Sequence, residues 1–79
     1  MSKSIESEDI KIRSDNDNYY INRDLALSLN EEYKAVQDYT RRAQLARKMN
    51  REDIAEMYDH IRKEEEEHLK EILNKLSTN

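Results

Sequence analysis

The sequence predicts an all-α protein folded as an antiparallel hairpin of two helices. Its 79 residues include no glycine and no proline, so the usual helix breakers are absent. Apolar residues recur at alternating steps of three and four along two segments, which is the spacing of one helical face. A short polar break, Met49–Arg51, separates the two segments. A connection of this length turns the second helix back along the first.

The expected helices span residues 20–48 and residues 51–76. Arg47 and Lys48 place positive charge in the last turn of the first helix, where the helix dipole favours it. Asn50 is suited either to the left-handed residue that ends a helix or to the cap of the next one. The expected inner stripes are Ile21, Leu25, Leu29, Glu32, Val36, Tyr39, Ala43 and Ala46 in the first helix, and Ile54, Met57 or Tyr58, Ile61, Glu65, His68, Ile72 and Leu76 in the second.

Residues 1–18 are polar, and we expect them to form a flexible N-terminal arm ahead of a hairpin over residues 19–79. The Asp15–Asn18 cluster has the composition of a turn or a helix cap. A hairpin this small buries too little apolar surface to be stable without disulfides, a metal or self-association. The chain has no cysteine, so a metal and self-association remain as the possible sources of stability. We therefore expect a homodimer, and a higher homo-oligomer built from dimers.

The charge and hydropathy patterns argue against two classes of partner. The formal net charge is −4, and no basic face is available to neutralise phosphates, which argues against nucleic acid. No apolar run approaches the roughly 18 residues of a membrane span. The first residues also lack the apolar core of a secretion signal. The sequence therefore predicts a soluble cytoplasmic protein.

Three polar residues interrupt the expected apolar stripes. Glu32 stands in the first stripe, and Glu65 and His68, three residues apart on one helical face, stand in the second. The point midway between Glu32 and Glu65 falls in the expected turn, so both carboxylates should lie at the same height in the hairpin. Burying an unpaired carboxylate costs several kcal/mol, which a bound cation would offset.

The chemistry of these side chains limits which metals the site could bind. Carboxylates with imidazole suit iron, manganese or zinc, and no thiolate is present to favour copper(I) or an iron–sulfur cluster. The alternative is a hydrogen-bonded glutamate–histidine pair at a plain helical seam. We expect the neighbouring glutamates 64, 66 and 67 to form a solvated face, and His60 to lie on the surface.

A glutamate on one helix and Glu-x-x-His on the next form half of a ferritin-like di-iron carboxylate site. The segments Glu31–Tyr39 and Arg62–His68 resemble the two ligand helices of the encapsulated ferritins. The resemblance implies that Glu32, Glu65 and His68 bind iron and that Tyr39 lies beside the centre. It also implies a dimer that forms a ferritin-like four-helix bundle with two iron ions at the interface. Lys34 departs from the family, which carries a further acidic residue at that position.

The resemblance implies a ferroxidase that oxidises Fe(II) to Fe(III) for iron storage or detoxification. Family members work inside an encapsulin shell, which makes that nanocompartment the implied location, although the residues after Leu76 resemble no shell-docking peptide. Two alternatives stay open. One is a rubrerythrin-like peroxide scavenger with the same centre. The other is a metal-free helical-bundle adaptor that dimerises, with the buried glutamates and histidine fixing its register.

Overall fold

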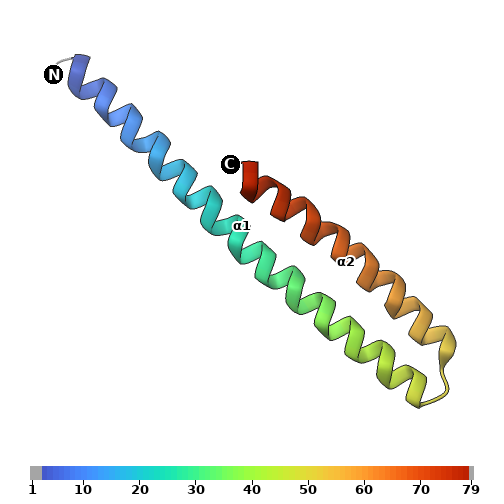
Figure 1. The fold of residues 1–79 in the computed structure, drawn as a ribbon. Helices are drawn as coiled ribbons and strands as arrows, with labels where there is room; N and C mark the ends of the chain where they lie inside the picture. Colours follow the sequence, from blue (N-terminus) through green and yellow to red (C-terminus); the bar gives the residue numbers. More distant parts are fainter. Residues whose placement is uncertain (1–2, 79) are drawn as a thin grey trace.

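The protein is an antiparallel hairpin of two α-helices (Figure 1). The computed structural model describes the backbone of residues 3–78 and the side chains of residues 17–78. Helix α1 spans Lys3–Lys48 and helix α2 spans Glu52–Thr78, with no strand in the described range. The all-α hairpin predicted from the apolar periodicity is therefore confirmed.

The two helices differ greatly in length. Helix α1 has 46 residues and α2 has 27, so α1 continues well past the end of α2, as Figure 1 shows. It begins at Lys3, upstream of the start near residue 20 that the periodicity predicts, and residues 3–18 of the expected arm belong to it. That stretch contains no glycine or proline to end a helix. The side chains before residue 17, with Met1, Ser2 and Asn79, lie outside the described residues. Neither helix, as far as it is described, is apolar enough to cross a membrane.

The turn between the helices is set by Asn50, whose φ of 61° is left-handed. The Arg51 N–H donates to the Ala46 carbonyl at 2.8 Å, and the Asn50 N–H donates to the Arg47 carbonyl at 3.1 Å. These two bonds form a Schellman motif, which satisfies carbonyls that the end of α1 leaves free. Of the two roles predicted for Asn50, the structure shows the one that ends α1.

The core of a single hairpin is thin. Within residues 17–78 the only buried apolar side chains belong to Ala43, Ala46 and Ala55. The radius of gyration is 20.4 Å, against about 12 Å for a compact chain of this length. Many large apolar side chains stay exposed: Tyr19, Tyr20, Ile21, Leu27, Tyr33, Leu45, Met49, Met57 and Leu73.

The strongest contacts between the helices lie toward the turn. The rings of Tyr39 and Tyr58 pack with their centroids 5.9 Å apart. Arg47 of α1 forms a hydrogen-bonded ion pair with Asp59 of α2. Together with the three buried alanines, these contacts fix the alignment of the helices and hence the heights of residues farther along them.

Candidate metal centre

The three polar residues of the inner stripes meet in the structure. Helix α1 supplies Glu32, and α2 supplies Glu65 and His68. One potential ligand atom from each lies within 4.8 Å of the others. The Nδ1 atom of His68 is 3.5 Å from Oε2 of Glu32 and 3.7 Å from Oε2 of Glu65. The equal heights expected from the hairpin arithmetic are thus found.

Glu32 carries an oxygen that the protomer does not satisfy. Its Oε2 atom is buried and has no hydrogen-bond partner among the described residues, and its side chain is 27% exposed. A buried carboxylate oxygen without a donor is costly. Histidine Nδ1 is too distant for a good hydrogen bond, so a cation between the three side chains would supply the missing interaction.

The environment of Glu65 is unfavourable to its negative charge. The adjacent Glu32 carboxylate and partial burial raise the pKa of Glu65 above the ordinary glutamate value, while His68 acts in the opposite direction. Two carboxyl groups in contact resist double ionisation unless a positive charge lies between them. A divalent cation would relieve this repulsion, and because protons compete with the ion for the Glu65 carboxylate, metal binding should weaken as the pH falls.

The other glutamates of the acidic run do not join this cluster. Each has a cationic or imidazole partner elsewhere on α2, one turn away. The pairs are Glu64 with His60 at 3.0 Å, Glu66 with Arg62, and Glu67 with Lys70 at 3.2 Å. His60, 76% exposed, lies on the surface as predicted. Surface ion pairs of this kind contribute little to stability.

His68 lies at the edge of the inner face rather than within it. Its side chain is 51% exposed, more than that of either glutamate. The neighbouring Leu69 is half-buried, so it occupies the stripe position predicted for His68. Of the two candidates nearer the start of α2, Tyr58 is half-buried and packs on Tyr39, whereas Met57 is exposed. The ligand cluster is therefore open on the side of the hairpin where His68 lies.

Tyr39 is placed beside a different partner. Its ring packs on Tyr58, and the Arg42 guanidinium lies over it, 5.1 Å from the ring centroid. It is two helical turns, or about 10 Å, from Glu32 along α1. Within one protomer the structure thus gives Tyr39 a packing role in the core.

The donor set of two carboxylates and one imidazole suits iron, manganese or zinc. Two carboxylates and one imidazole are the ligand types that Fe(II) and Fe(III) accept in proteins. It is the only group of three such residues in the described part of the chain. Three protein ligands are too few for two ions, so a two-iron centre needs ligands from a second chain.

Comparison of the chain with known protein families, curated proteins and solved structures finds no match. The functional argument therefore depends on the geometry of the cluster and on the chemistry of its side chains.

Proposed function

We propose that the protein is a ferroxidase whose di-iron centre forms between two copies of the chain. The observation that carries this proposal is the buried, unpartnered Oε2 of Glu32, which faces a second carboxylate and an imidazole. Three such side chains converging on one point are costly without a cation and well suited to hold one.

Dimerisation would complete both the ligand set and the core. In a two-fold dimer each site residue meets its own copy across the axis, so two protomers supply four glutamates and two histidines. The cluster is open where His68 is exposed, which gives a second protomer access. The many exposed apolar side chains give a second reason for association, since a single hairpin covers few of them. The result would be a ferritin-like four-helix bundle.

The side chains have distinct tasks in this proposal. Glu32 and Glu65 would hold ferrous iron and still bind it after oxidation, because carboxylates can shift between terminal and bridging modes. His68 would fix the position of each ion at the open edge. The bound iron would supply one-electron oxidation at each ion: two Fe(II) would give two Fe(III), and the two electrons, with two protons from solvent, would reduce one dioxygen to hydrogen peroxide. Zinc would occupy the same ligands but cannot be oxidised, so it should inhibit.

Oxidation of ferrous iron in air tests the proposal directly. Glu32→Ala and His68→Ala should each remove the ferric absorbance that the unaltered protein produces. Glu67→Ala is the matched control, because Glu67 is exposed and pairs only with Lys70. Equal loss of activity in all three variants would contradict the shared centre. The assay is then repeated anaerobically with hydrogen peroxide. Faster oxidation of iron by dioxygen indicates a ferroxidase, and faster oxidation by peroxide indicates a peroxide scavenger.

One observation favours a second function, a metal-free dimerisation module. Because the pKa of Glu65 is raised by its contact with Glu32, a protonated Glu65 could donate to the Glu32 carboxylate without any metal. Such a buried pair could fix the register of a helical bundle. Purified protein that binds no iron, manganese or zinc at stoichiometric levels would support this function and contradict the ferroxidase.

A further inference from the structure

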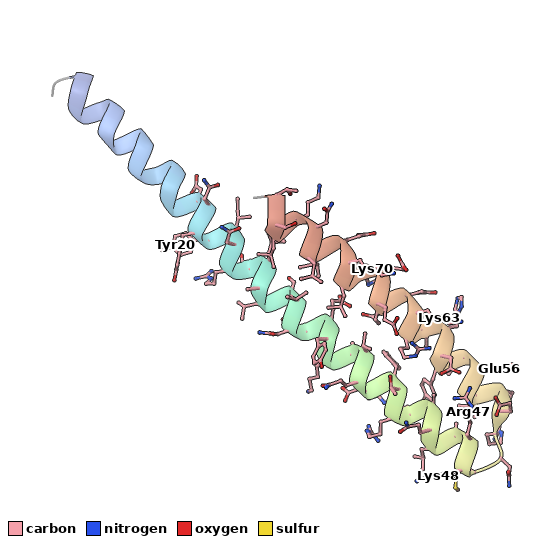
Figure 2. The ribbon with its side chains drawn as sticks, in the orientation of Figure 1. Tyr20, Arg47, Lys48, Glu56, Lys63 and Lys70 are labelled. Carbon is pink, nitrogen blue, oxygen red and sulfur yellow. The ribbon has the colours of Figure 1, made fainter. Side chains whose placement is uncertain are left out.

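Helix α1 carries a second stripe on the side turned away from α2. Its members follow one another at alternating steps of three and four residues, so they share one face. All but Asp38 are exposed in the hairpin, and Figure 2 shows Tyr20 and Lys48 projecting from this side. This outer stripe consists of Asp17, Tyr20, Asp24, Leu27, Glu31, Lys34, Asp38, Arg41, Leu45 and Lys48.

Apart from Asp38, the charged residues of the outer stripe are acidic in its first half and basic in its second. Acidic residues recur every seven positions in its first half, and basic residues recur every seven in its second. The acidic set is Asp17, Asp24 and Glu31, and the basic set is Lys34, Arg41 and Lys48. Asp24 pairs with the adjacent Arg23 at 3.3 Å, while the other five make no ion pair with any described residue. The pattern reverses its sign about the point between Glu32 and Tyr33.

We propose that α1 of a second copy binds along the outer stripe in antiparallel orientation, with a two-fold axis between Glu32 and Tyr33. In such a pair, residues equally far from the axis face each other. The facing layers would be Glu31 with Lys34, Asp24 with Arg41, Asp17 with Lys48, Tyr20 with Leu45, and Leu27 with Asp38. Four of the five layers join opposite charges or two apolar side chains. A parallel pair in register would instead place like charges together, which is unfavourable.

An apolar groove receives one of these layers. Leu45 borders a groove of about 250 Å³ that Met49 and Ile54 also line. The Tyr20 side chain is 50% exposed in the free hairpin and that of Leu45 is 54% exposed. The antiparallel register brings Tyr20 of the second copy to Leu45 at the mouth of this groove. Its ring can cover the apolar lining while its hydroxyl stays near Arg42, which forms one wall.

The axis of this contact lies at the height of the metal cluster but on the opposite face of α1. Glu32 adjoins the axis, so the two clusters of a dimer would lie at one height. Thr78, the last described residue of α2, lies thirteen residues beyond Glu65, which places it level with residue 19 of α1. The part of α1 that lies beside α2 therefore runs from about residue 19 to Lys48, and its midpoint is near the axis. In the antiparallel pair, these parts of the two α1 helices would overlap along their whole length. This contact uses the face of α1 opposite to the metal cluster, so it is separate from the contact that would share the iron ligands, and it would join such dimers into a higher oligomer.

Disulfide trapping tests the register, because the chain has no cysteine of its own. Tyr20→Cys with Leu45→Cys should form a covalent dimer under mild oxidation, since the two positions face each other between chains. Within one chain they are about 37 Å apart along α1, so they cannot bridge each other. Tyr20→Cys alone should stay monomeric on a denaturing gel. No cross-linking by the double variant, or equal cross-linking by Tyr20→Cys alone, would overturn the antiparallel register.

Charge reversal tests the pairing independently. Arg41→Glu with Lys48→Glu should weaken the homodimer, raising its dissociation constant about tenfold or more. Asp17→Lys with Asp24→Lys should do the same, and an equimolar mixture of the two variants should form a heterodimer of restored affinity. Lys63→Glu with Lys70→Glu is the matched control: it makes the same charge change on α2 (Figure 2) and should leave the dimer intact. Failure of the mixture to associate would contradict the proposal.

Both tests are done on metal-free protein in the presence of a chelator, so they do not depend on iron chemistry. A correct disulfide pattern without metal binding would leave this register standing and remove the ferroxidase. Iron oxidation that needs Glu32, together with a wrong disulfide pattern, would leave the ferroxidase standing and remove this register.

Discussion

The turn end of the hairpin and its middle differ in what one protomer can satisfy. At the turn end, Ala55 is fully buried, Asn50 closes a complete Schellman motif, and Arg47 pairs with Asp59 across the helices. In the middle, Glu32 has a buried oxygen without a partner and His68 is half-exposed. The turn end thus has the properties of a structural element. The middle leaves polar groups of the described protomer without a partner.

The largest expected effect comes from removing the polar cluster. Glu32→Leu, Glu65→Leu and His68→Met together should abolish iron binding and stabilise the metal-free protein by about 1–4 kcal/mol, because apolar replacements need no counter-charge. Urea unfolding with a chelator present measures this. Glu64→Leu with Glu67→Leu is a control on the exposed face and should leave iron binding unchanged. A large loss of stability in the triple variant would show that the middle is structurally satisfied after all.

The turn end should respond in the opposite sense to added volume. Ala55 is 0% exposed, so Ala55→Leu should force the helices apart and cost about 1–3 kcal/mol. Ala26→Leu, at an exposed position on α1, is the matched control and should change stability little. Thermal unfolding followed by circular dichroism measures both. Equal tolerance of the two substitutions would mean that the turn end is not closely packed.

A smaller effect is expected at the turn residue itself. Asn50 has a φ of 61°, which Ala adopts less readily than Asn, so Asn50→Ala should lower the free energy of unfolding by about 1 kcal/mol. Asn50→Gly should be neutral or slightly stabilising, since glycine has no Cβ to clash in this region. Chemical unfolding of both variants separates the two causes. A backbone effect would destabilise only Asn50→Ala, whereas loss of an Asn50 side-chain interaction would destabilise both variants.

The smallest effect is a difference in pH dependence between the two regions. The hydrogen bond from Arg47 lowers the pKa of Asp59, so between the lowered and ordinary values the unfolded chain binds more protons. Stability from Asp59 is therefore lost as the pH falls through that interval. The pKa of Glu65 is raised, so the folded metal-free protein binds more protons between the ordinary and raised values. Stability from Glu65 is therefore lost as the pH rises through its interval.

Urea unfolding of metal-free protein from about pH 3 to pH 7 checks these opposite slopes. Asp59→Asn should remove the loss on the acidic side, and Glu65→Gln should remove the loss on the less acidic side. If both variants keep the pH dependence of stability seen in the unaltered protein, neither carboxyl group controls it.

Helical arithmetic was sufficient to predict much of this structure from the sequence. The absence of helix breakers and the two apolar stripes predict the hairpin, and Asn50 marks the break between the helices, although the sequence leaves open whether it ends the first or caps the second. The meeting of Glu32, Glu65 and His68 follows from the equal distances of the two glutamates from the turn and from the three-residue spacing of Glu65 and His68. Each of these features depends on spacing along the chain, which a sequence displays directly.

Features that depend on which side chains meet across the helices could not be predicted in the same way. The apolar periodicity predicts a start of α1 near residue 20, and the Asp15–Asn18 cluster has the composition of a helix cap. In the structure α1 begins at Lys3 and runs through this cluster. Met57 and Tyr58 are adjacent, so the stripe alone did not decide between them. The Arg47–Asp59 pair and the unpartnered Glu32 oxygen depend on side-chain positions in three dimensions.

Anaerobic titration with ferrous iron, followed by native mass spectrometry, tests the shared centre most directly. The account predicts a dimer that saturates at one iron per chain, with two irons in each dimer and none in a dimer of the Glu32→Ala variant. A monomer that carries iron by itself, or unchanged iron binding in the Glu32→Ala protein, would contradict it.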